Sequence, residues 1–152
     1  MIGISLYQGY TTRTRIMEGI SLAMAVKAKI STDVNNDISL QDTITQWNAG
    51  SGGKGITSKY VESILLKTNG EIEIKYKSDA LGLGSTENTL IVSPWIKMDN
   101  TQFIPLQQAI QNGITGALDW SCASASKKWA TSNGMTPTSG TLPSGYAPDN
   151  CR

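Results

Sequence analysis

Residues 59–77 read KYVESILLKTNGEIEIKYK, and this stretch decides the fold class. A run of β-forming residues is followed by Asn69-Gly70, which favours a type I′ hairpin turn because both residues accept a positive φ angle. From residue 71 to 77, charged and apolar residues alternate, so the isoleucines and Tyr76 should share one face of a strand. The stretch therefore predicts an antiparallel hairpin with one buried and one solvated face.

Two further strands are expected downstream of the hairpin, at residues 89–96 and 114–122. Pro94 has no backbone N–H to donate to a neighbouring strand, so the first of these strands is expected to end or bulge there. Residues 57–122 as a whole thus predict a four-stranded antiparallel sheet.

The region before the hairpin predicts one long helix. Residues 6–30 contain no proline, and their apolar residues recur at helical spacing. Met17 and Met24 widen this apolar stripe and are expected to pack in the core. Residues 31–56 are polar and rich in glycine, which predicts a long connection with a short helix between Ser39 and Trp47. A helix lying across one face of an antiparallel sheet places residues 1–152 in the α+β class, as a single domain.

The composition argues against an enzyme. The chain has no histidine, which excludes a histidine-based catalytic triad within it and removes the commonest metal ligand. Its net charge of +1 argues against a strongly basic nucleic-acid binder. No stretch approaches the roughly 18 consecutive apolar residues of a membrane-spanning helix. We therefore predict no catalytic residues, no cofactor and no metal site.

Two motifs that suggest chemistry have simpler interpretations. Gly50, Gly52 and Gly55 match G-x-G-x-x-G, but a dinucleotide site needs a strand before the motif and a helix after it. Here a polar loop precedes the motif and a strand follows, so a flexible loop is expected. Glu62, Glu71 and Glu73 could supply the carboxylate pair of a glycosidase, but Glu71 and Glu73 are expected on the solvated face of the hairpin, opposite lysines.

The two cysteines, Cys122 and Cys151, are separated by 28 residues and match no metal or redox spacing. They are either two unrelated buried thiols or one disulfide. The segment between them is poor in core-forming residues, and such a segment gains most from a covalent link, which favours the disulfide. A disulfide of this loop length stabilises a fold by about 3–4 kcal/mol and indicates an oxidising compartment.

Aromatic and basic residues gather around this segment. Trp120, Trp129 and Tyr146 either form a small core beneath the loop or stack on a ligand. Lys127, Lys128 and Arg152 form a modest basic cluster that would give only weak, salt-sensitive binding to phosphates.

Five segments, in this order, resemble type IV pilins. They are the segment after the hydrophobic helix (7–15), the first strand (57–64), the first hairpin (69–72), the last strand with the first cysteine (117–122), and a Leu-Pro element before the second cysteine (142–152). The resemblance covers nearly the whole chain and is strongest to type IVa major pilins of Gram-negative bacteria.

The resemblance implies a long N-terminal helix (6–30), an αβ-loop (31–56), an antiparallel sheet (57–122) and a disulfide-bonded loop (122–151). It also implies an apolar, methylated helical segment before Met1 that assembles the filament core. The cysteine-closed loop is the part that the family uses for adhesion, which makes Lys127, Lys128, Trp129 and Tyr146 candidate receptor-binding residues.

The function implied is that of a structural subunit of a surface filament for adhesion and twitching motility, with DNA uptake as a further role. Expected partners are other subunits in a helical homopolymer, the inner membrane before assembly, the assembly machinery, a host-cell or surface receptor, and, for DNA uptake, DNA. The alternatives are a pseudopilin of type II secretion, a minor pilin, and a secreted sugar-binding module that acts alone.

Overall fold

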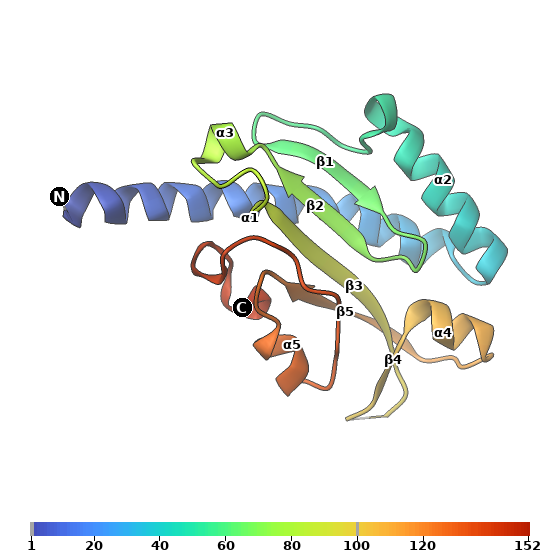
Figure 1. Ribbon diagram of the computed structural model, residues 1–152. Coiled ribbons are helices and arrows are strands. Elements are labelled where there is room, and N and C mark those ends of the chain that lie inside the picture. The colour runs from blue at the N-terminus through green and yellow to red at the C-terminus, as the bar shows by residue number, and fades with distance from the viewer. Residues whose placement is uncertain (1, 100) are drawn as a thin grey trace.

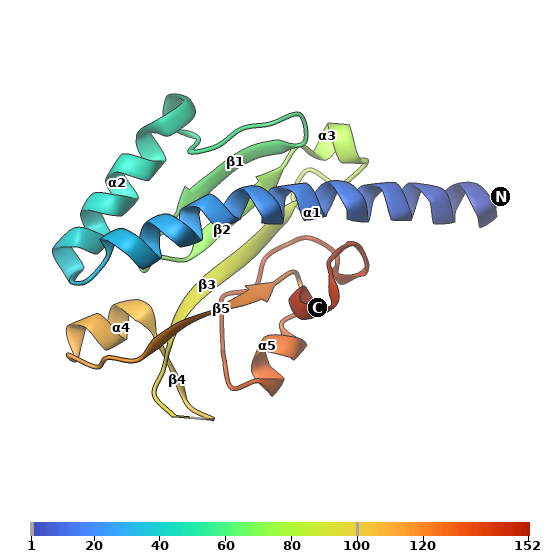
Figure 2. The same ribbon diagram turned by 180° about the vertical axis from the view of Figure 1, so that it is seen from behind.

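The computed structural model describes the backbone of residues 2–99 and 101–152, and side chains from residue 9 onward apart from residue 100. A long helix, α1 (Ile2–Asp33), runs across one face of an antiparallel sheet, and its first turns project beyond the sheet (Figures 1 and 2). The expected α+β architecture is confirmed. No helix in the described part of the chain is long and apolar enough to cross a membrane.

The sheet is built around its third strand. Its strands are β1 (Val61–Leu66), β2 (Ile72–Tyr76), β3 (Thr89–Lys97), β4 (Phe103–Pro105) and β5 (Ala117–Ala123). All pairs are antiparallel, and β3 pairs with β2, β4 and β5. The four long strands correspond to the predicted ones. The short β4 was not predicted, because three residues carry no periodic signal.

The expectation that β3 ends or bulges at Pro94 is wrong. The strand continues through Pro94, which lies opposite Trp120 of β5. On the other edge of β3, pairing with β2 ends at Val92 and pairing with β4 begins at Trp95. Pro94 therefore lies where that edge has no strand partner, which is the position in a strand where a missing donor costs least.

The hairpin turn also differs from the prediction. In a type I′ turn both central residues have a positive φ, but here Gly70 is positive (φ 90°) and Asn69 is not. The Gly70 amide donates to the Lys67 carbonyl, and the Asn69 side chain accepts from the Glu71 amide. The side-chain bond fixes a three-residue loop in which only glycine needs the left-handed conformation.

Helix α1 buries one stripe against the sheet. Ile16, Ala23, Val26 and Ile30 are essentially inaccessible. Gly19 belongs to the same stripe, because a Cβ there would lie 2.5–2.7 Å from the ring and hydroxyl of Tyr76.

The hydroxyl of Tyr76 is itself buried and donates to the Ile16 carbonyl at 2.6 Å. Gly19 lowers the helix propensity of α1, but it is required because helix and sheet approach each other most closely there. The prediction that Met17 and Met24 pack in the core is wrong, since they are 46% and 63% exposed.

The connection between α1 and the sheet is more helical than expected. This connection contains α2 (Asp37–Gly53). At its N-terminus the Asn36 side chain accepts from the Ser39 amide and the Ser39 side chain accepts from the Asn36 amide, which together form a capping box. Within α2, Leu40 and Ile44 are buried, whereas Ile38 is 76% exposed. The glycine-rich end, at residues 50–52, leaves helical geometry, which agrees with the loop expected there.

The remaining elements are short. They are α3 (Ser78–Leu81), α4 (Leu106–Gln111), α5 (Lys128–Ser132), and the 3-10 turns η1 (Ser144–Tyr146) and η2 (Asp149–Cys151). The last three belong to the C-terminal loop, which lies beside β5 and α1 (Figure 2).

Candidate functional site

The C-terminal loop, residues 122–151, is closed by a disulfide between Cys122 at the end of β5 and Cys151 in η2. Both cysteines are buried, and their Cα atoms are 4.6 Å apart. The hydroxyl and the amide of Ser124 both donate to the Cys151 carbonyl, at 2.6 Å and 2.9 Å. The chain terminus is thus bonded to the last strand by side chain and backbone as well as by sulfur.

A second, smaller core lies under the loop. Trp95 of β3, Ala130 of α5 and Met135 are buried together, with Phe103 partly buried against them. The indole of Trp95 donates to the Ser121 hydroxyl at 2.9 Å. Since this core is separate from the main one, α5 is positioned by few apolar contacts.

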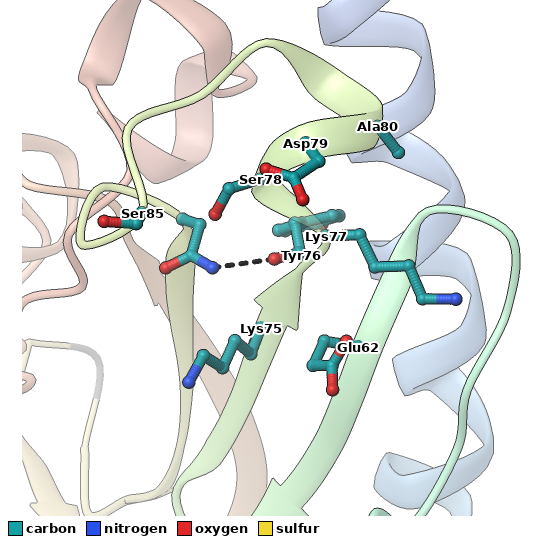
Figure 3. A pocket seen from close by; sticks show the side chains of 9 residues that line it. Glu62, Lys75, Tyr76, Lys77, Ser78, Asp79, Ala80 and Ser85 are labelled. Atoms are coloured by element: carbon teal, nitrogen blue, oxygen red, sulfur yellow. Dashed lines mark hydrogen bonds between the residues drawn. The ribbon is translucent and has the colours of Figure 1, made fainter.

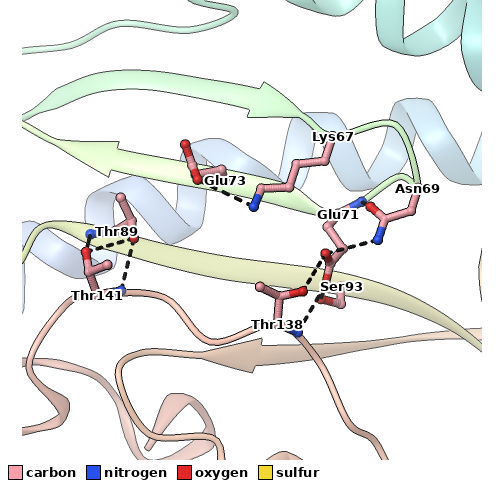
Figure 4. A network of polar contacts seen from close by, with 8 residues as sticks. All are labelled: Lys67, Asn69, Glu71, Glu73, Thr89, Ser93, Thr138 and Thr141. Atoms are coloured by element: carbon pink, nitrogen blue, oxygen red, sulfur yellow. Dashed lines mark hydrogen bonds and ion pairs between the residues drawn. The ribbon is translucent and has the colours of Figure 1, made fainter.

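Polar contacts attach the middle of the loop to the sheet (Figure 4). The carboxylate of Glu71 accepts hydrogen bonds from Thr138, and the hydroxyl of Thr141 accepts from the amides of Asn88 and Thr89. The prediction of a solvated Glu71 is therefore wrong: its side chain is 6% exposed. Its neighbour Glu73 is partly exposed and its carboxylate lies 3.7 Å from the Lys67 ammonium, as expected for a charged, solvated face.

The candidate receptor-binding residues do not form one patch. Lys127, Lys128 and Trp129 lie together at the start of α5, and Trp129 is 39% exposed. The ammonium of Lys127 already donates to the Pro137 carbonyl at 3.1 Å, so it also holds the loop. Tyr146 lies in η1, partly buried against the main core.

The other two residues of these clusters also have internal partners. Trp120 is partly buried beneath the ammonium of Lys27, which lies 5.6 Å from the ring centroid. Burial lowers the pKa of Lys27, although the nearby carboxylate of Asp119 opposes the shift. The guanidinium of Arg152 donates to the Ala147 carbonyl at 2.9 Å. The aromatic residues thus divide between the main core and an exposed position at Trp129.

A hollow of about 450 Å³ opens on the sheet beside α3 (Figure 3). Its charged lining residues are of both signs: Lys75, Lys77, Glu62 and Asp79. A hydrogen bond and charge from Lys54 lower the pKa of the Glu62 carboxyl. No group of three residues able to hold a metal ion is found among the residues that the structure describes.

Comparison with known proteins gives one consistent result. The family described as Pilin (bacterial filament) matches residues 12–152. A crystal structure of a type IV pilin from Pseudomonas aeruginosa, strain Pa110594, superposes with a TM-score of 0.89 at 42% sequence identity. The match covers 93% of this chain and 98% of that one. No curated protein matches the chain.

Type IV pilins are structural proteins that form extracellular surface filaments. The chain has their arrangement of a long N-terminal helix, an antiparallel sheet and a C-terminal disulfide. It belongs to the pilin family, as a type IV pilin.

Proposed function

We propose that the chain is the repeating subunit of an adhesive type IV pilus and that its C-terminal loop makes the contact with a surface receptor. The observation that carries this proposal is the position of Trp129. A large apolar side chain, 39% exposed, lies on an outer loop, next to the exposed Lys128. Tryptophan is among the residues that contribute most to binding interfaces.

The backbone beneath Trp129 is well fixed, which favours binding. The Trp129 amide donates to the Arg152 carbonyl at 2.9 Å, one residue from the disulfide. A side chain held on a fixed backbone loses less conformational freedom when it binds.

Association with other subunits follows from the family, and we infer that the outer face of α1 contributes to it. Tyr10, Met17 and Met24 are 65%, 46% and 63% exposed and lie seven residues apart, on one face of the helix. A shallow hollow of about 460 Å³ adjoins Met17 and Leu22. Exposed apolar ridges of this kind are typical of surfaces that become covered on assembly.

The remaining partners are part of the same proposal. Before assembly the subunit is held in the inner membrane by an apolar segment and is delivered by the assembly machinery; the filament then serves adhesion and twitching motility. DNA uptake would be a second role of the filament, and the exposed lysines at the start of α5 give it only weak support. A few phosphate contacts give weak and strongly salt-dependent binding.

The filament is tested by electron microscopy of a pilin-deleted bacterium that expresses the full-length precursor, with gold-labelled antibody against this domain. Label along thin surface filaments is the expected result. Label restricted to filament tips would instead indicate a minor pilin. Envelope label without filaments would contradict the proposal and favour a pseudopilin or an isolated binding module.

The binding loop is tested with Trp129→Ala in the same strain, because truncation removes the exposed indole. We expect attachment to fall at least severalfold while filament number is unchanged. Met98→Ala is the matched control, since Met98 is 44% exposed on a different turn. Equal attachment by both variants would show that α5 is not the contact.

A further inference from the structure

Glu71 lies at a gap in the sheet. Strands β2 and β3 pair Ile72 with Val92, and continuing this register places Glu71 opposite Ser93. At that point the edge of β3 that faces β2 no longer has a strand partner. Residues 136–138 of the C-terminal loop adjoin this gap and line, with Glu71 and Ser93, a crevice of about 120 Å³. Pro137 is buried there, so this part of the loop is docked on the sheet rather than extended into solvent.

Both oxygens of the Glu71 carboxylate are fully used. Oε1 accepts from the Asn69 amide group and from the Thr138 hydroxyl, each at 3.0 Å. Oε2 accepts from the Ser93 hydroxyl at 2.6 Å and from the Thr138 backbone amide at 3.3 Å. One carboxylate thus joins the β1–β2 turn, the central strand and the C-terminal loop (Figure 4).

No cation neutralises this carboxylate in the part of the chain that the structure describes, so its partners are dipoles. On the turn, Lys67 pairs with Glu73 of β2, and further along β2 Lys75 is exposed. On the loop, the ammonium of Lys127 is bonded to the Pro137 carbonyl. The β3 residues between Thr89 and Ile96 carry no charge. The protonation state of the Glu71 carboxyl therefore decides how strongly the C-terminal loop is attached to the sheet at this point.

We propose that Glu71 is a positioning residue for the C-terminal loop: as a carboxylate it holds residues 136–138 on the sheet, and its protonation releases them while the disulfide stays closed. The proposal concerns where the loop lies and holds whatever the loop binds. It assigns the loop a second attachment, which is polar and acid-sensitive, in addition to Cys122–Cys151.

The electrostatics agree with this role. Burial raises the pKa of the Glu71 carboxyl, but hydrogen bonds from Ser93, Asn69 and Thr138 outweigh burial and hold the pKa below its ordinary value. A carboxyl with a lowered folded-state pKa stabilises the fold fully above the ordinary pKa, about 4.3. That contribution is lost as the pH falls through the lowered pKa, so the loop stays docked at neutral pH and loosens only in acid.

The test is an NMR titration of the 152-residue chain with its disulfide intact, following the Thr138 amide from pH 7 into acid. The wild-type amide should shift with a midpoint below the ordinary pKa of a glutamate, and its protection against exchange should fall in the same pH range. A Thr138 amide that does not titrate would overturn the proposal without requiring any variant.

Two variants sharpen the test. Glu71→Gln replaces one oxygen by a donor that faces two other donors, so at pH 7 the Thr138 amide should exchange severalfold faster and the titration should vanish. Glu73→Gln is the matched control, because Glu73 lies two residues further along, in β2, and pairs with Lys67 rather than the loop. Thr138→Val, at an exposed position, should weaken the attachment while folding normally. Unchanged exchange of the amide at residue 138 in both Glu71→Gln and Thr138→Val would contradict the proposal.

Discussion

In the β1–β2 hairpin most side chains are fully or partly buried, with one face of the sheet packed against α1, whereas in the C-terminal loop buried residues are scattered among exposed ones. The hairpin is held by a continuous apolar surface. The loop is held by discrete links: one disulfide, the Glu71 carboxylate, the Thr141 hydroxyl and a small core at Trp95. Because the links of the loop are separate from the apolar surface, the loop can change its sequence and contacts while the sheet remains intact, which suits an outer binding surface.

The largest effect is expected in the apolar region. Ile74→Ala removes a fully buried side chain from the face of β2 that packs on α1 and should destabilise the protein by about 2–5 kcal/mol. Urea denaturation would measure it as a lower midpoint with an unchanged slope. A loss under about 1 kcal/mol would mean that the sheet does not depend on this packing.

The disulfide should come next. Replacing both Cys122 and Cys151 by serine should cost about 3 kcal/mol through the larger conformational freedom of the unfolded chain. In the same urea series, the unfolding of the sheet should remain cooperative. A chain that no longer folds would show instead that the loop and the sheet form one unit.

A single polar link of the loop should matter less. Thr141→Val keeps the shape of the side chain but removes the hydroxyl that accepts from the Asn88 and Thr89 amides, both at 3.1 Å. We expect the free energy of unfolding to fall by about 1 kcal/mol. Thermal melting compared with Thr115→Val, at an exposed position in the segment before β5, gives the matched control. Equal melting temperatures would indicate that water replaces these bonds.

The smallest effect is expected on the solvent face of α1. Lys29 pairs with Asp33 at 2.7 Å, one turn apart, and both side chains are well exposed. Lys29→Ala should change stability by less than about 0.5 kcal/mol, and less still in high salt. A larger loss in thermal melting would show that this face is packed more closely than the structure indicates.

Local pattern predicted the hairpin strands, the presence of α1 and the order of the main elements, because alternation and helical spacing are properties of neighbouring residues. It did not predict the full length of α1, which runs from Ile2 to Asp33 rather than over residues 6–30. It could not predict the burial of Glu71, since the partner that covers this carboxylate, Thr138, is 67 residues away. Charge alternation alone gives Glu71 and Glu73 the same environment, and only the gap in pairing beside Ser93 separates them.

The two methionines of α1 were misplaced for a related reason. Apolar spacing shows that a helix is amphipathic, but Met17 and Met24 lie on a second apolar face, away from the stripe of Ile16 and Ala23. Gly19 is the signal that was available, because a glycine in the middle of a helix often marks the side on which another element approaches closely.

For the candidate binding loop, the cysteines and the gathering of Lys127, Lys128 and Trp129 could be predicted, because these three residues are adjacent in the chain. It could not separate Tyr146, which packs on the main core, from Trp129, which remains exposed. That separation depends on where η1 and α5 dock, and few residues of the loop show any periodic pattern.

The sheet is held by its apolar core, and the C-terminal loop is held by its own separate links. Residue-resolved hydrogen exchange of the chain, with the Cys122–Cys151 disulfide intact and then reduced, distinguishes the two. We predict that amides of β2 and β3 keep their protection on reduction, whereas amides of α5 and η2 lose theirs. Loss of protection in the strands and the loop together would contradict it.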